Sequence, residues 1–214
     1  YATFEQLIDD RRANPKDDMV TYLTTVEMEG QKLTRNEILD ICYLLLLGGL
    51  DTVTASLGCF IAYLANNPAQ RARIVKDPTL IPNAVEELLR WETPVMTLPR
   101  VVKQDVTLGG TEIPAGQLVT LLIGAADTDE REFPNGDVVD FDREMNRHIA
   151  FGAGAHRCLG SHLARMELYV GLEEWHRRIP NYQIKAGETP RYSPGIREVQ
   201  YLPLVWETNR GGAL

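Results

Sequence analysis

The pattern of apolar and polar positions predicts one long helix that begins at Thr34 and ends at Asn66. Thr34 and Glu37 have the spacing of a capping box, in which two side chains satisfy free backbone N–H groups at a helix start. Within this helix, residues 41–50 are apolar on every face. A surface helix is apolar along one stripe only, so we expect this helix to run through the middle of a protein and to be covered on all sides.

The rest of the chain predicts a mainly helical protein with a minor β-sheet. Further expected helices, which end near prolines, are residues 68–76, 83–91 and 159–178. Expected short strands are residues 100–102, 106–108, 113–116, 118–122 and 199–206. Residues 124–157 are expected to be a long coil, and a coil of that length usually builds a functional site. No linker or repeat divides the sequence, so residues 1–214 are expected to form a single unit.

Charge and cysteine content restrict the class of protein. The 22 basic and 30 acidic side chains give a net charge of −8, which argues against a nucleic-acid partner because phosphate contacts need a basic surface. The three cysteines are odd in number and form no CxxC pair, so we expect a reducing, cytoplasmic location. The longest apolar run has ten residues, whereas a membrane-spanning helix needs about 20, so no membrane partner is expected.

The densest group of chemically distinctive residues is the segment 151–160, Phe-Gly-Ala-Gly-Ala-His-Arg-Cys-Leu-Gly. Its glycines allow the backbone to approach something flat or bulky. Cys158 ends this loop where the last helix is expected to begin, and the positive end of a helix stabilises a thiolate. We therefore expect Cys158 to be a metal ligand or a nucleophile. A zinc site with His156 and His162, a cysteine hydrolase with a histidine base, and a turn cysteine without function are alternatives, and the glycines favour a large planar ligand.

Two other patterns allow a structural or a functional interpretation. The segment 48–52, Gly-Gly-Leu-Asp-Thr, places two helix-weakening glycines ahead of an acid and a hydroxyl. It predicts either a kink with a satisfied polar pair or a groove opened for function. Glu87 and Arg90 are three residues apart and therefore share one helix face, where such pairs are common and usually solvated.

The segment 151–160 resembles the haem-binding loop of the cytochromes P450, in which a cysteine thiolate is the axial ligand of the haem iron. The resemblance covers essentially all 214 residues and is greatest for the soluble bacterial camphor-hydroxylating enzymes. Other supporting segments are residues 48–53, 81–90, 129–132, 158–165 and 199–206. The fold that this implies is the C-terminal portion of the cytochrome P450 fold, and we expect the upstream half to be absent from this chain.

The resemblance implies a haem b cofactor, protoporphyrin IX iron, with Cys158 as the metal ligand. Arg100 and His156 match positions that pair with the haem propionates. The other implied cofactor contacts are Leu44, Gly48, Gly49, Ala150, Phe151, Gly152, Leu159, Gly160 and Ala164. The implied catalytic residues are Asp51 and Thr52, which in the family supply protons during oxygen activation.

Three further sets of residues take roles from the resemblance. Glu87, Arg90 and Arg143 match a buried network that holds the haem loop in place. Arg165 is our choice for the residue that faces a redox partner, because residues 143–165 carry four arginines against one acid. The implied substrate pocket is lined by Val95, Met96, Thr97, Leu98 and Ile196.

The implied function is a haem-thiolate monooxygenase that hydroxylates a small to medium hydrophobic substrate. It would use O2 and take electrons from an iron–sulfur ferredoxin with its reductase. A haem-binding half-domain, or an inactive P450-like protein without turnover, is the alternative. The sequence departs from the family pattern at residues 126–129, which are Ala-Asp-Thr-Asp where the family usually has Ala-Asn-Arg-Asp. The segment 90–100 is also one residue longer than in the camphor enzyme, so camphor is not carried over as the substrate.

Overall fold

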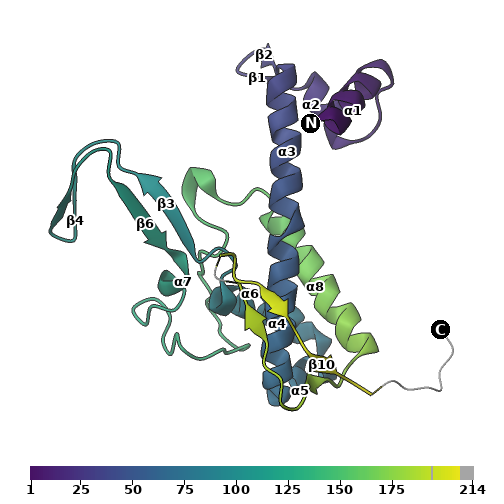
Figure 1. The fold of residues 1–214 in the computed structure, drawn as a ribbon, viewed down its shortest axis with the longest axis vertical. Helices are drawn as coiled ribbons and strands as arrows, with labels where there is room; N and C mark the ends of the chain where they lie inside the picture. Colours follow the sequence, from purple (N-terminus) through teal and green to yellow (C-terminus); the bar gives the residue numbers. More distant parts are fainter. Residues whose placement is uncertain (194, 208–214) are drawn as a thin grey trace. The chain divides into compact units, whose positions relative to one another are not determined.

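The computed structural model describes residues 1–193 and 195–207. Contacts between Cα atoms group the chain into two compact units, Tyr1–Asp51 and Thr52–Leu214. Figure 1 shows the order of the elements along the chain. The expectation that residues 1–214 belong to one domain stays a prediction, and each unit is described by itself.

The first unit consists of helices and a short hairpin. Its elements are α1 (Ala2–Ala13), α2 (Met19–Thr25), the antiparallel strands β1 (Glu27–Met28) and β2 (Gln31–Lys32), and α3 (Arg35–Leu50). The capping box predicted at the start of α3 is confirmed. Thr34 Oγ1 accepts a hydrogen bond from Glu37 N–H, and the Glu37 carboxylate accepts one from Thr34 N–H (2.7 Å). Ile8, Leu23 and Ile38 are buried and form the core of this unit.

The C-terminal half of α3 is apolar but exposed. Leu44 is 65% exposed, and the other exposed large side chains of this stretch are Tyr43, Leu45, Leu46, Leu47 and Leu50. The sequence predicts that this part of α3 is covered on all sides, but the described residues leave it exposed. By length and composition the segment Arg35–Asn66 is also long and apolar enough to cross a membrane. Of its most apolar 18-residue stretch, 22% is buried. The core helix of a globular protein meets the same criteria, so the expectation of no membrane partner stays a prediction.

The single helix predicted over residues 34–66 is interrupted at Asp51. Helix α3 ends at Leu50, and α4 (Thr52–Asn66) begins the second unit. Asp51 itself keeps right-handed helical angles, with φ −100° and ψ −36°. The interruption follows the two glycines at positions 48 and 49, each of which costs a helix about 1 kcal/mol relative to alanine.

Helices form most of the second unit. Besides α4 they are α5 (Pro68–Lys76), the 3₁₀ helix η1 (Pro78–Leu80), α6 (Ile81–Glu92), the short α7 (Ile123–Ala126), the 3₁₀ helix η2 (Gly154–His156) and α8 (Ser161–Arg178). Helices α4, α6 and α8 contact one another, and the core of this unit includes Phe60, Leu88 and Leu168. Helix α6 begins before Pro82, not after it as predicted, because the first turn of a helix does not need the N–H that proline lacks.

The described strands of the second unit form antiparallel pairs. These pairs are β3 (Thr97–Val101) with β6 (Leu118–Leu122), β4 (Val106–Leu108) with β5 (Thr111–Ile113), β7 (Gln183–Ile184) with β10 (Leu204–Val205), and β8 (Arg191–Tyr192) with β9 (Val199–Tyr201). The one closing strand predicted at residues 199–206 is two strands, separated at Pro203, which has no N–H to donate to a strand partner. The prediction of a mainly helical protein with a minor sheet is confirmed.

Candidate active site

Backbone hydrogen bonds close the loop that carries Cys158. Gly152 N–H donates to Ile149 O (2.7 Å), and Cys158 N–H donates to Phe151 O (2.8 Å). On the far side, Ser161 N–H donates to Cys158 O (3.4 Å) where α8 begins. These bonds hold the thiol at a defined place, between the end of the long coil and the start of a helix.

Two glycines give this loop a shape that other residues adopt rarely. The angle φ is +70° at Gly152 and +69° at Gly154, both in the left-handed region. A Cβ at Gly152 would lie 3.4 Å from His156 O, whereas a Cβ at Gly154 would meet nothing within 4 Å. The residues from 153 to 160 are exposed, and Leu159 is 83% exposed. The loop therefore presents open backbone and apolar surface beside Cys158, as a flat apolar ligand requires.

Cys158 is an exposed, unpaired thiol in front of the 18-residue helix α8. Gly160 is the N-cap of that helix, so the thiol lies near its positive end, where a thiolate is stabilised. The Cys158 sulfur also contributes to raising the pKa of Arg165, after the larger effect of the Glu86 carboxylate.

The structure disfavours the zinc alternative for Cys158, and it shows that two of the four histidines are engaged elsewhere. Among residues 1–193 and 195–207, no group of three or more His, Cys, Asp and Glu side chains could hold a metal ion, which disfavours zinc. His148 bonds to Glu86, and His176 is buried with its ring nitrogens at Leu172 O and Tyr182 Oη. Neither of these histidines is therefore free to act as the base of a cysteine hydrolase.

Glu87, Arg90 and Arg143 come together in one buried network. The Glu87 carboxylate accepts bonds from Arg90 Nε and Nη2 (2.8 Å each) and from Arg143 Nε (3.1 Å). Asp140 N–H and Asn146 Nδ2 donate to the same carboxylate (2.9 and 3.0 Å). Burial alone would raise the pKa of Glu87, but the hydrogen bonds and charges, first among them Arg90, lower it. The pair is therefore not a solvated surface pair, and it fixes the coil that leads to the Cys158 loop.

Arg165, the expected partner-facing residue, has an internal partner. Its Nε and Nη2 donate to the two oxygens of Glu86 (2.6 and 2.8 Å), and its guanidinium lies 4.5 Å from the centre of the Phe151 ring. Its side chain is only 22% exposed. Arg165 is thus paired with Glu86 inside the protein, and its assignment to a docking surface stays a prediction. Arg147 and Arg157 are the exposed arginines of this region.

The two residues with an expected catalytic role are neighbours in the sequence. Asp51 ends the first unit and Thr52 begins the second. Asp51 is the exposed last residue of the first unit, and a Cβ at Gly48 or Gly49 would meet nothing within 4 Å. Thr52 is half-buried at the start of α4, where its carbonyl oxygen accepts a hydrogen bond from Ser56 Oγ (2.8 Å). Their part in proton supply stays a prediction.

The segments expected to line the substrate pocket lie side by side. Arg197 N–H, next to Ile196, donates to Pro94 O, next to Val95 (2.9 Å). The Arg197 guanidinium also pairs with the buried Glu92 at the end of α6. Two segments that are about a hundred residues apart in the sequence are thus joined in the structure. The remaining expected pocket residues are Met96, which precedes β3, and Thr97 and Leu98 on β3.

The other expected cofactor contacts lie on β3, on α3, in α8 and in the coil before the Cys158 loop. Arg100 is exposed on β3, donates to Pro99 O (2.8 Å), and forms no ion pair within the described residues. Ala150 and Ala164 are half-buried, before the loop and in α8 respectively. Leu44 is exposed on α3.

The sequence analysis gave Asp127 no functional role and named it only as part of a departure from the family pattern. It is fully buried, and it accepts hydrogen bonds from Ile149 N–H (2.7 Å) and Thr93 Oγ1 (3.0 Å). Burial raises the pKa of its carboxyl group. Thr128, in place of the usual arginine, bonds to Gly124 O (3.1 Å). Asp127 therefore helps to anchor the coil just before the Cys158 loop.

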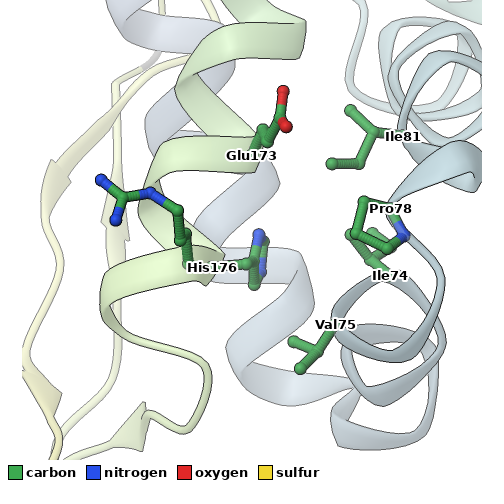
Figure 2. A pocket seen from close by; sticks show the side chains of 7 residues that line it. Ile74, Val75, Pro78, Ile81, Glu173 and His176 are labelled. Atoms are coloured by element: carbon green, nitrogen blue, oxygen red, sulfur yellow. The ribbon is translucent and has the colours of Figure 1, made fainter.

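A cavity of about 250 Å³ lies elsewhere in the second unit (Figure 2). It is lined by Ile74, Val75, Pro78, Ile81, Glu173, His176 and Arg177. These residues come from α5, η1, α6 and the last turns of α8, whereas Cys158 precedes the first turn of α8. The cavity contains no expected site residue.

Comparison with known proteins gives the class. The family model described as Cytochrome P450 matches residues 2–178, and the chain therefore belongs to the cytochrome P450 family. It is 41% identical over 212 residues to mycinamicin IV hydroxylase/epoxidase of Micromonospora griseorubida, covering 96% of this chain and 53% of that protein. It is 37% identical to the biotin biosynthesis cytochrome P450 of Bacillus subtilis, covering 96% and 52%.

Solved structures show the same fold. A Bacillus megaterium cytochrome P450 in complex with testosterone has a TM-score of 0.90 and 35% identity, covering 96% of this chain and 57% of that one. The chain thus corresponds to the C-terminal portion of the P450 fold, as predicted, and it spans about half the length of the curated relatives it matches. Members of this family are monooxygenases and hydroxylases, and the family implies haem.

Proposed function

We propose that this chain is the haem-binding part of a bacterial P450 monooxygenase that hydroxylates a hydrophobic substrate. The observation that carries the proposal is the Cys158 loop. An exposed thiol lies at the positive end of a long helix, beside two left-handed glycines and exposed apolar surface. A planar apolar ligand whose metal takes a single thiolate fits these features better than zinc does.

Residues of both β3 and the loop fit the haem that the family implies. Cys158 would ligate the iron, and Arg100 and His156, both exposed, would pair with the propionates. The glycines at positions 152 and 154 would let the backbone approach the macrocycle. Bound haem supplies the oxygen chemistry that inserts one atom of O2 into a C–H bond.

Asp51 and Thr52 are the groups that we propose to hold and move protons. A carboxylate exposed at a helix interruption can exchange protons with water, and the neighbouring hydroxyl can pass them on. Proton transfer by these residues would distinguish a monooxygenase from a protein that only stores haem, because haem storage needs no proton transfer.

The proposed substrate is a small to medium hydrophobic molecule. Val95, Met96, Leu98 and Ile196 are apolar, and the Arg197–Pro94 hydrogen bond supports their placement along one wall. The relatives include proteins named for mycinamicin IV and for steroids, and these names support a hydrophobic substrate without fixing its identity.

An acidic ferredoxin, reduced by its own reductase in the cytoplasm, is the proposed electron donor. Arg147 and Arg157, which precede Cys158 in the sequence, are exposed and would attract such a partner. Opposite charges of this kind mainly increase the rate of encounter, and their effect falls with salt.

The Cys158→Ala variant of the haem-loaded, full-length protein tests the proposal. It should lose the long-wavelength band that a thiolate-ligated haem gives when reduced and treated with CO. The control is Cys42→Ala, which removes a buried thiol from the first unit and should keep the band. A band that persists in Cys158→Ala would refute the assignment. Product formation with ferredoxin and reductase then separates the monooxygenase from a haem-binding protein without turnover.

A further inference from the structure

The carboxylate next to Glu87 forms a second network of its own. Glu86 lies on α6, and its side chain is 24% exposed. It accepts hydrogen bonds from Arg165 Nε and Nη2 (2.6 and 2.8 Å), from His148 Nε2 (3.0 Å) and from Tyr169 Oη (3.1 Å). None of these donors is bonded to Glu87. Neighbouring acids on one helix thus hold different parts of the chain.

His148 connects Glu86 to the segment that enters the Cys158 loop. Ala150 N–H donates to His148 Nδ1 (3.3 Å), and His148 Nε2 lies 3.0 Å from the Glu86 carboxylate. The His148 side chain is only 2% exposed. Its ring therefore bridges α6 and the backbone of Ala150, one residue before Phe151.

Arg165 connects Glu86 to the loop itself and to the helix that follows it. Its guanidinium lies 4.5 Å from the centre of the Phe151 ring, and the Phe151 carbonyl accepts the hydrogen bond of Cys158 N–H (2.8 Å). A continuous set of contacts therefore runs from Glu86 through Arg165 and Phe151 to the backbone of Cys158. Tyr169, one turn further along α8, adds a third point of attachment.

We propose that Glu86 is a positioning residue that fixes the Cys158 loop from both sides, through His148 before it and Arg165 after it. The proposal rests on the proposed function, in which Cys158 ligates haem iron. Glu87 fixes the upstream coil around residues 140–146, whereas Glu86 contacts the residues that flank the thiolate. Without the Glu86 carboxylate, Arg165 and His148 lose their shared anchor, and the Cys158 sulfur leaves the iron more readily.

The test compares Glu86→Gln with Glu174→Gln in the haem-loaded, full-length protein. The control removes the same charge from Glu174, an exposed acid of α8 that pairs with Arg177 and Arg178 one turn further along the same helix. The measurement is the rate at which the reduced CO complex loses its thiolate band in mild denaturant. We expect Glu86→Gln to lose the band about ten-fold faster or more, since a charge-assisted hydrogen bond is removed. The control should stay within about two-fold of the wild type.

A second variant guards against simple unfolding of Glu86→Gln. Arg165→Lys keeps the positive charge but cannot form the paired bonds to Glu86 or lie flat over Phe151. It should lose the thiolate band faster than wild type at nearly unchanged melting temperature, which a purely structural role would not produce. If both variants behave like Glu174→Gln, the inference is wrong while the proposed function stands. If the wild type itself gives no thiolate band, the proposed function is wrong, and this inference fails with it.

Discussion

Replacing Glu87 by Gln is expected to destabilise the second unit strongly. The Glu87 side chain is 1% exposed and that of Arg90 is 0% exposed, so both charges of this pair are removed from water. Removing one partner of a buried pair costs about 3–5 kcal/mol, because the other charge stays buried. Arg90 also donates to Asp127 O, Gly136 O and Val138 O, and these bonds place the cost near the lower end of that range. Since a domain is stable by about 5–15 kcal/mol, a large part of its stability would be lost.

Urea unfolding followed by circular dichroism measures this loss. The matched control is again Glu174→Gln, whose acid is 41% exposed, and exposed ion pairs contribute about 0–1 kcal/mol. An unchanged slope of the unfolding free energy against urea concentration in both variants would show that unfolding exposes the same amount of surface as in the wild type. A Glu87→Gln variant within about 1 kcal/mol of wild type would refute the argument that the network is a main support of the fold.

Three further predictions concern protons, partner and pH. Thr52→Ala should take up electrons at nearly the wild-type rate but form much less hydroxylated product and more peroxide, measured as the yield of each per electron. Asp51→Asn should instead slow oxygen consumption. A variant that keeps both the wild-type rate and the wild-type product yield would contradict the proposed proton relay. Arg157→Glu should raise the KM for ferredoxin several-fold at low salt and less at high salt, unlike Arg178→Glu on the last turn of α8. The pKa of Glu86 is about 2 against its usual 4.5, because hydrogen bonds from a histidine and an arginine outweigh burial, which alone would raise it. Its contribution to stability is therefore complete above pH 4.5 and is lost as the pH falls toward 2, and urea unfolding of Glu86→Gln should show a weaker pH dependence across that interval.

Features fixed by local sequence could be predicted well. The Thr34 capping box depends on residues three positions apart, and the structure has both of its hydrogen bonds. The predicted start of α5 at Pro68 is confirmed, and so is its predicted end before Asp77 and Pro78. Pro82 misled the prediction for α6, because proline in a first turn is tolerated and does not mark the boundary by itself.

Contacts between distant segments could not be predicted from composition or spacing. Arg165 and Glu86 are 79 residues apart, and nothing local distinguishes an arginine that pairs across two helices from one that faces solvent. The hydrogen bond from Arg197 N–H to Pro94 O, and the one from Ile149 N–H to the Asp127 carboxylate, depend in the same way on the packing of the second unit.

The pairing of the arginines also changes the electrostatic argument for a redox partner. Counted along the sequence, residues 143–165 carry four arginines and one acid. In the structure, Arg143 binds Glu87 and Arg165 binds Glu86, so both charges are compensated inside the protein. The exposed set is then Arg147 and Arg157 against Glu144. This segment alone offers a weak field, and tight docking of an acidic ferredoxin therefore requires further basic residues outside it. The salt dependence of the Arg157→Glu effect should accordingly account for only part of the salt dependence of the wild-type association.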